Sequence, residues 1–356
     1  MGLRHTTRPS YFVHDGTIQV EEAVKMVLAG RNPYLENYLD TPLAEWPRYR
    51  PSPAANPALY HLAYLPFTIV FAVPFYLVMQ AAVGWFDLRL VYLLLLLLTL
   101  WLLPRLAPGR KQATLLPLAV ALNPLFLPYF VEGRNDVFVL FWLVLSLVLL
   151  QKGRPGGSVV ALALACASKL TAWFILPFYG LYFWRQVCRS DFSRQPVAEA
   201  TTTNRPVRTA LWSSLPYLAL FLVILSVMIL PFALWNPQAF LEDVWLYPSG
   251  RTLAHQYPLI SLGLGGLGVA LGWFPQLGAT FPFSWLQLLF GGPTLLLLLY
   301  RQGQRNTLAQ LWLNYGLLTL VIGLFSYVFN DNHLGYVTVL LTIGYLLQKQ
   351  NADGAD

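Results

Sequence analysis

The sequence predicts an all-α, polytopic transmembrane protein, and its composition and its long apolar stretches are the observations that predict it. Hydrophobic residues make up 56% of the 356-residue chain and charged residues only 11%, well below the roughly 25% charged residues of soluble domains. Residues 88–103, 137–150 and 211–234 are almost free of charge, and each stretch approaches the ~20 residues that cross a bilayer as a helix. We expect about 8–10 membrane helices, including short or half-inserted ones.

The first segment, residues 1–61, is expected to be an outer-face loop that contains an amphipathic helix. Apolar residues recur at helical spacing from Val20, while Glu21 and Glu22 fall on the opposite face. Residues 1–17 are polar and do not resemble a signal peptide. We therefore expect either a preceding helix outside this chain or a first span that inserts in reverse.

The second segment, residues 62–349, is expected to form the transmembrane helical domain, followed by a cytoplasmic tail at 350–356. Residues 62–84 contain two prolines, which interrupt the helical hydrogen-bond ladder, so we expect a half-inserted or interfacial hairpin on the outer side. Residues 158–184 begin and end beside basic residues, so we expect two short helices that meet near Lys169. Irregular backbone at membrane depth needs protein or a water-filled cavity around it.

The distribution of Lys and Arg predicts which segments face the cytoplasm. These residues concentrate in four loops, at 105–111, 152–154, 185–208 and 301–305. The other polar segments, which hold most of the acids and nearly every His, are expected on the extracytoplasmic face: residues 1–60, 132–136, 236–257 and 330–333. Because the basic residues are spread among loops and form no patch with interleaved aromatics, nucleic acid is not an expected partner. Cys166 and Cys188 lie in unlike surroundings, so no disulfide is expected.

Two acidic positions on the outer side have both a structural and a functional interpretation. Asp15 precedes the amphipathic helix, where it would cap the helix or act as a general base on an acceptor hydroxyl. The segment Glu132-Gly-Arg134-Asn135-Asp136 precedes an apolar stretch. It is either a solvated turn in which Asp136 caps the next helix, or the source of a second carboxylate opposite Asp15.

Lys169 and the remaining polar segments likewise have both a structural and a functional interpretation. Lys169 lies in an otherwise apolar stretch, where an ionisable residue marks a functional site with a partner or extends its amine to the interface. Asn330 to His333 form a polar turn, and Arg251 and His255 lie on a long outer loop. These residues suit a phosphate or sugar site, but also plain solvation. The sequence has no metal-ligand spacing, phosphate loop or nucleophile-elbow motif in a suitable context.

Four motifs together resemble the membrane glycosyltransferases of the GT-C fold. They are Asp15, the Gly30-x-Asn32-Pro33-Tyr34 end of the first helix, Asn123-Pro124 followed by the 132–136 segment, and Ser168-Lys169-Leu170-Thr171. The likeness runs from about residue 11 to residue 349. It is nearest to the family 87 polyprenyl-phosphate-mannose-dependent mannosyltransferases, and more distant to the catalytic subunit of the first GPI mannosyltransferase.

The resemblance implies an inverting transfer of mannose or another hexose from a polyprenyl-phosphate donor to a lipid or glycan acceptor. It further implies a multi-pass protein of the plasma membrane (a bacterial inner membrane) whose active site is extracytoplasmic. Asp15 would be the base, Glu132 or Asp136 the second-loop acid, and Lys169 the residue near the donor phosphate. Glu22 matches a further acid of the GPI enzyme. The other candidates for donor-phosphate or substrate binding are Tyr34, Arg134, Asn135, Arg251, His255 and His333.

The motif His14-Asp15-Gly16 is not Asp-x-Asp, so a metal requirement does not carry over; no cofactor is assigned, and a divalent cation stays possible. Two other function classes remain open. A secondary transporter of a polar or lipid-linked solute also uses broken helices and a buried Lys, although the chain shows no paired halves. A non-catalytic membrane partner would keep the GT-C-like fold without its chemistry.

Overall fold

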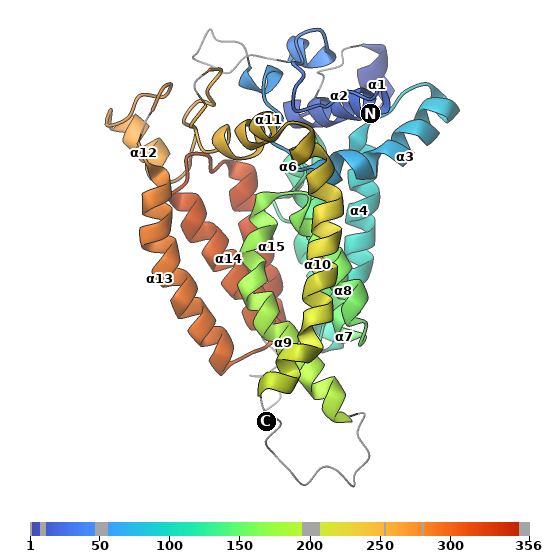
Figure 1. The fold of residues 1–356 in the computed structure, drawn as a ribbon, viewed down its shortest axis with the longest axis vertical. Helices are drawn as coiled ribbons and strands as arrows, with labels where there is room; N and C mark the ends of the chain where they lie inside the picture. Colours follow the sequence, from blue (N-terminus) through green and yellow to red (C-terminus); the bar gives the residue numbers. More distant parts are fainter. Residues whose placement is uncertain are drawn as a thin grey trace.

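The computed structural model describes residues 2–7, 12–46, 56–193, 207–252, 254–279 and 281–348. Long helices run side by side as a bundle, and short helices lie across one end of it, which we call the capped end (Figure 1). The bundle helices are α4 (Leu88–Leu102), α5 (Arg110–Ala121), α7 (Asp136–Gln151), α8 (Pro155–Cys166), α9 (Leu176–Ser193), α10 (Val207–Trp235), α13 (Phe283–Gln304), α14 (Leu308–Leu324) and α15 (Asp331–Gln348).

The capped end carries the helices that do not run along the bundle and the turns that connect them. They are α1 (Gly2–Thr6), α2 (Asp15–Leu28), α3 (Pro66–Val83), α6 (Leu127–Glu132), α11 (Pro237–Leu241) and α12 (Leu264–Ala270), with the 3-10 turns Pro42–Glu45 and Pro57–Leu59 and the π-helix Glu242–Leu246. Two more 3-10 turns, Leu103–Leu106 and Leu170–Ile175, lie within the bundle. The described residues contain no strand beyond the isolated bridge between Ser261 and Phe329.

Within the described ranges, four helices are long and apolar enough to cross a membrane: α3, Leu88–Leu106, Ser214–Trp235 and α13. Three shorter apolar helices, α7, α8 and α14, pack among them. Only 6% of the Ser214–Trp235 window is buried inside the protein. An apolar helix exposed along most of its length suits a hydrocarbon environment, since soluble monomers rarely expose large apolar patches. The predicted all-α, polytopic membrane fold is confirmed.

The predicted amphipathic helix is α2, and it is more deeply buried than its sequence pattern indicates. On its apolar face Val20 and Val24 are fully buried, whereas Leu28 at the end of the helix is exposed. Its other face is covered as well, because Glu21 forms a two-bond ion pair with Arg4 at 3.0 and 2.6 Å and accepts from the backbone N–H of Leu88 at 2.9 Å. The helix therefore joins α1 to the start of α4.

The predicted helix end at Gly30 is confirmed, but the predicted cap at the start is wrong. Gly30 has φ +70°, a left-handed conformation that glycine adopts without steric cost. At the other end Asp15 is the first helical residue, and His14 is the N-cap, its Nδ1 accepting from the backbone N–H of Gly16 at 3.1 Å. The carboxylate of Asp15 is thus available for other contacts.

Residues 62–84 do not form the hairpin that their prolines predicted. They form the single helix α3, which leans outward from the capped end in Figure 1 instead of running along the bundle. Pro66 occupies the first turn, where its missing N–H needs no acceptor. Pro74 lies in the middle of the helix without ending it. The neighbouring turns satisfy enough of the backbone for the helix to continue.

The predicted interruption near Lys169 is confirmed. Helix α8 ends at Cys166, Lys169 has extended backbone, and a 3-10 turn from Leu170 leads into α9. The backbone N–H of Phe67, at the start of α3, donates to the carbonyl of Ala167 at 3.2 Å. The broken segment is therefore held against protein, as irregular backbone at this depth requires.

The order of the bundle helices puts the described basic residues of the four loops at the end opposite the cap, which we call the basic end (Figure 1). The middle of the 185–208 loop and the predicted tail at 350–356 lie outside the described residues. The extracytoplasmic placement of the capped end stays a prediction.

Candidate active site

Asp15 lies at the start of α2, where its carboxylate is buried and held by neutral donors. Residue Asp15 is 4% exposed. Its Oδ1 accepts from the backbone N–H of Gly16 at 2.7 Å, and its Oδ2 accepts from the side-chain amide of Asn56 at 3.0 Å. The Nδ1 atom of His14 lies 3.1 Å from Oδ1. Burial is the main reason that the pKa of His14 is lowered, so this imidazole is largely neutral at pH 7.

The segment from Glu132 to Asp136 packs directly against the start of α2. The backbone N–H of His14 donates to the carbonyl of Glu132 at 2.8 Å, and Thr17 Oγ1 donates to the carbonyl of Gly133 at 2.6 Å. Gly133 has φ +93°, and a Cβ there would lie 2.4 Å from Thr17 Oγ1. Only glycine satisfies both the backbone angle and the close approach. This contact brings the two predicted acidic segments together.

Asp136 is buried and paired with a cation, in contrast to Asp15. Lys169 Nζ donates to its Oδ1 at 2.5 Å, and the side-chain amide of Asn332 donates to its Oδ2 at 2.8 Å. Asp136 is the first residue of α7, whose N-cap is Asn135. The interpretation of Asp136 as a helix cap is therefore wrong: its side chain turns toward Lys169 because an ion pair is stronger than a backbone cap in a buried site.

Arg134 carries the second cation of the site and reaches it from the rim. Its Nη1 donates to Asn332 Oδ1 at 2.8 Å, its Nε lies 3.4 Å from Glu132 Oε2, and its guanidinium lies 5.1 Å above the ring of Tyr129. The side chain of Glu132 is 40% exposed. Of the two candidate second-loop acids, Asp136 therefore lies inside the site and Glu132 lies at its edge.

We call these side chains together the polar cluster. Its members are His14, Asp15, Asn56, Tyr64, Glu132, Arg134, Asn135, Asp136, Lys169, Asn332 and His333. His14 lies within the electrostatic reach of Lys169 and Arg134 as well as of Asp15. Asp15 and Asp136 both act on the phenol of Tyr64, whose hydroxyl lies where a Cβ on Gly16 would be. One site thus contains a carboxylate on neutral donors, a carboxylate on a cation, and a further guanidinium.

His333 and Asn135 complete the cluster without forming ion pairs. His333 Nδ1 accepts from the backbone N–H of Asn330 at 3.0 Å, and its ring stacks on Phe329. Asn135 is 2% exposed, and its side-chain NH2 group has no hydrogen-bond partner among the described residues. A buried donor without a partner costs free energy in the free protein, which makes Asn135 a candidate contact for a polar ligand.

Four other candidates lie outside the cluster. Tyr34 is buried and its hydroxyl donates to the carbonyl of Tyr64 at 2.7 Å, so it helps to fix the backbone at Tyr64. Glu22 pairs with the exposed Lys25 at 2.6 Å. The last two follow the π-helix: Arg251 is exposed and hydrogen-bonds Ser284, and His255 stacks on Tyr60 with ring centroids 3.4 Å apart.

Three residues of the cluster were not among those predicted from the sequence: Asn56, Tyr64 and Asn332. Asn332 lies in the 330–333 turn, so its polar neighbours were a signal for it. Asn56 and Tyr64 had no comparable signal in the sequence, because their roles come from contacts with α2 across tens of residues. No group of three or more His, Cys, Asp or Glu that could hold a metal ion occurs in the described part of the chain.

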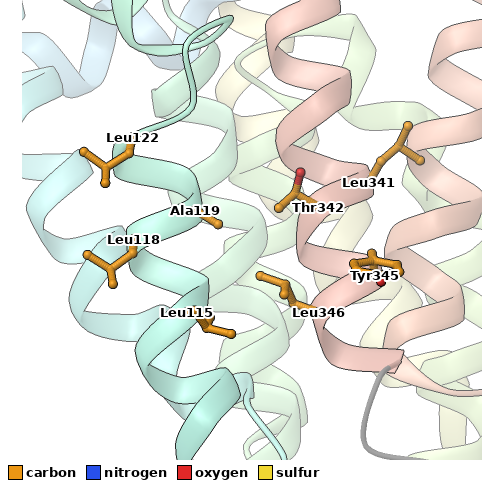
Figure 2. Close-up of a pocket in the computed structure, with 8 residues that line it drawn as sticks. All are labelled: Leu115, Leu118, Ala119, Leu122, Leu341, Thr342, Tyr345 and Leu346. Atoms are coloured by element: carbon orange, nitrogen blue, oxygen red, sulfur yellow. The ribbon is translucent and has the colours of Figure 1, made fainter. Parts of the chain in front are cut away.

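A separate apolar groove lies between α5 and α15, with a volume of about 640 Å³ (Figure 2). Its lining is Leu115, Leu118, Ala119, Leu122, Leu341, Thr342, Tyr345 and Leu346. Asn123 and Thr338 hydrogen-bond each other at 3.1 Å between these two helices, on the capped-end side of the groove. The groove contains no charged side chain, so it suits hydrocarbon chains of the bilayer and not a sugar.

Comparison with known families relates part of the chain to a described family. Residues 24–185 match the family described as Alpha-(1->6)-mannopyranosyltransferase, N-terminal domain. This match confirms the likeness to GT-C mannosyltransferases and shows a glycosyltransferase of the mannosyl type. Asp136 and Lys169 lie within the matched residues, whereas Asp15 and His333 lie outside them. No curated protein matched the chain.

Proposed function

We propose, from the mannosyltransferase match as the premise, that the protein transfers a mannosyl group with inversion from a polyprenyl-phosphate carrier. The acceptor is a hydroxyl of a lipid or glycan, and the reaction takes place on the extracytoplasmic face of the plasma membrane. The observation that carries the proposal is the division of charge in the polar cluster. Asp15 is a buried carboxylate held by the backbone N–H of Gly16 and the side-chain amide of Asn56. In the same cluster, Lys169 pairs with Asp136, and Arg134 donates to Asn332.

This division suits direct displacement at a sugar carbon. Asp15 takes the proton of the acceptor hydroxyl while that oxygen attacks the anomeric carbon, and the bond from this carbon to the phosphate oxygen breaks. The carrier leaves as polyprenyl phosphate with the bonding electron pair. Its added negative charge lies toward Lys169 and Arg134, which stabilise it. The proton on Asp15 has His14 Nδ1 as a neighbour at 3.1 Å, which gives it a route away from the site.

The competing classes make different predictions. A secondary transporter would need no general base, and the match of residues 24–185 to a mannosyltransferase family supports the transferase instead. A non-catalytic partner would keep the fold and lose transfer. Two cations, Lys169 and Arg134, within one polar cluster are an arrangement that such a partner would not need.

The test is transfer by the purified chain in proteoliposomes, with polyprenyl-phosphate mannose and nucleotide-linked mannose offered separately. We expect transfer from the lipid donor only, and an inactive Asp15→Asn variant. Glu36→Gln is the matched control, since Glu36 pairs with Arg31 on the exposed surface, and it should keep wild-type transfer. Transfer from the nucleotide donor alone, or full activity of Asp15→Asn, would contradict the proposal.

The side of the membrane is tested by labelling. In a background without Cys166 and Cys188, single cysteines are placed at the exposed positions Asp40 and Gln304, at the two ends of the bundle. An impermeant maleimide added to intact cells should label the Asp40→Cys protein and leave the Gln304→Cys protein unlabelled. The reverse pattern would put the polar cluster on the cytoplasmic face.

A further inference from the structure

A part of the chain outside the family match packs against residues 60–62. The segment from Asp243 to His255 is fixed to the N-terminal half at two points. His61 Nδ1 lies 2.9 Å from Asp243 Oδ1, and the backbone N–H of Leu62 donates to Asp243 Oδ2 at 2.9 Å. The ring of His255 stacks on Tyr60. Although burial alone would lower the pKa of His61, its hydrogen bond to Asp243 raises it, which strengthens the first contact.

This segment contains a π-helix. The backbone N–H of Tyr247 donates to the carbonyl of Glu242 at 2.8 Å, and that of Arg251 donates to the carbonyl of Leu246 at 2.9 Å. Both bonds span five residues, a spacing that is rare and is often found at functional sites. The wider turn places the ring of Tyr247 between those of His61 and Tyr257, with centroids 4.7 and 5.5 Å away.

The hydroxyl of Tyr247 has no structural task in the free protein. Tyr247 is 3% exposed, and its hydroxyl has no hydrogen-bond partner among the described residues. A buried hydroxyl without a partner is costly, and such groups in native proteins call for an explanation. Burial raises the pKa of this phenol far above its ordinary value, so the group stays neutral and able to donate.

The charges around Tyr247 indicate what kind of group it would meet. Asp15 and Asp243 are carboxylates that act on it, whereas Lys169 is paired with a different carboxylate, Asp136. A phosphate beside two carboxylates would be repelled. A neutral hydroxyl, which both donates and accepts, suits this position.

We propose that Tyr247 binds a sugar hydroxyl next to Asp15, as a specificity-determining residue of the transfer reaction. His61 and Asp243 are positioning residues that fix the π-helix from which it projects. The inference rests on the proposed function, because it needs a sugar in the polar cluster. The hydroxyl belongs either to the transferred mannosyl group or to a sugar of the acceptor, and the experiment separates these two sources.

The first test compares two tyrosines that differ only in whether their hydroxyl has a protein partner. Tyr247→Phe should lower kcat/KM about tenfold, the loss of one hydrogen bond, without lowering the thermal midpoint. Tyr38 is the control, since it is fully buried and donates its hydroxyl to the carbonyl of Pro33 at 3.2 Å. Tyr38→Phe should lower the thermal midpoint and leave kcat/KM unchanged. Wild-type kcat/KM for Tyr247→Phe, or a fall in its thermal midpoint like that of Tyr38→Phe, overturns the inference.

The second test identifies the hydroxyl with monodeoxy analogues of the donor sugar and of the acceptor. Wild-type protein should discriminate against the one analogue that lacks the contacted hydroxyl, and Tyr247→Phe should use this analogue and its parent equally well. If this discrimination is lost in the donor series, the contacted hydroxyl belongs to the transferred sugar. If it is lost in the acceptor series, the hydroxyl belongs to the acceptor. If discrimination in both series is the same with and without the Tyr247 hydroxyl, the inference is overturned.

A binding measurement separates this inference from the proposed function. In the Asp15→Asn background, the affinities for the lipid donor and for the acceptor are measured with and without Tyr247→Phe. A roughly tenfold weaker binding of one of them supports the inference, and unchanged affinity for both overturns it. If the Asp15→Asn variant still transfers the sugar, Asp15 is not the general base. The inference about Tyr247 is then still decided by the measured affinities.

Discussion

Asp15 and Asp136 occupy the same kind of position and have opposite surroundings. Each is the first residue of a helix at the capped end, and they are 4% and 3% exposed. Asp15 is held by a backbone N–H and by the amide of Asn56, while Asp136 pairs with Lys169. The difference teaches that the partner of a helix-start acid, a neutral donor or a cation, depends on which distant segment packs against it.

The largest expected effect is the contrast between the two Asp→Asn substitutions. Asp15→Asn should reduce transfer on the order of 10² to 10⁴-fold, because a general base is lost, and should change the thermal midpoint little. Asp136→Asn should reduce both transfer and stability, because it leaves the Lys169 ammonium without its anion. Transfer assays and melting curves of both variants check the contrast. Equal losses of stability in the two variants would contradict the expected difference between Asp15 and Asp136.

The next effect concerns Lys169. Lys169→Met should lower the free energy of unfolding by about 3 kcal/mol, because it leaves Asp136 buried without a cation. Adding Asp136→Asn should restore most of the stability but not the transfer. Lys169→Arg should keep part of the activity, since the charge stays and the geometry changes. Lys25→Met is the control: its partner is Glu22 and its side chain is 47% exposed, so it should cost less than about 1 kcal/mol.

A smaller effect is expected from Asn332, which bridges the two charged groups. Asn332→Ala removes the amide between Asp136 and Arg134, and should cost about 1–2 kcal/mol of unfolding free energy. The Lys169 ion pair should keep Asp136 in place, so transfer should fall less than in Asp136→Asn. Asn37→Ala, at an exposed amide that bonds Leu39, is the matched control for melting experiments.

The smallest effect comes from Asp87, a third helix-start acid that does cap its helix. Its carboxylate accepts from the backbone N–H of Arg89 at 3.0 Å and pairs with that guanidinium at 2.7 Å. Burial alone would raise the pKa of Asp87, but the bonds from Arg89 and the charge of Arg4 lower it below its ordinary value.

Because the folded pKa of Asp87 is lowered, its contribution to stability is complete above the ordinary pKa of 3.8 and is lost as the pH falls through the folded pKa. The loss should be on the order of 1 kcal/mol. Melting curves between pH 7 and the acid range should show a step below about pH 4 that is reduced in Asp87→Asn. An equal acid step in both proteins would contradict this assignment.

Much of the fold followed from local patterns. Apolar stretches longer than a soluble core needs predicted the membrane helices, and Gly30 and Lys169 marked a helix end and a helix break, because backbone conformation and desolvation act within a few residues. The hairpin at 62–84 was wrong, because Pro74 interrupts one hydrogen bond without deciding what the neighbouring turns do.

The candidate site, too, was predictable from the sequence only in part. The sequence by itself determined that the acids gather at one end of the bundle, away from the basic loops, since net charge and hydropathy are properties of each segment alone. Only the tertiary structure decided which acid meets a cation: Asn56, Lys169 and Asn332 reach the two carboxylates from 41, 33 and 196 residues away. The strength of each contact depends on burial and distance, which exist only once those segments are packed together.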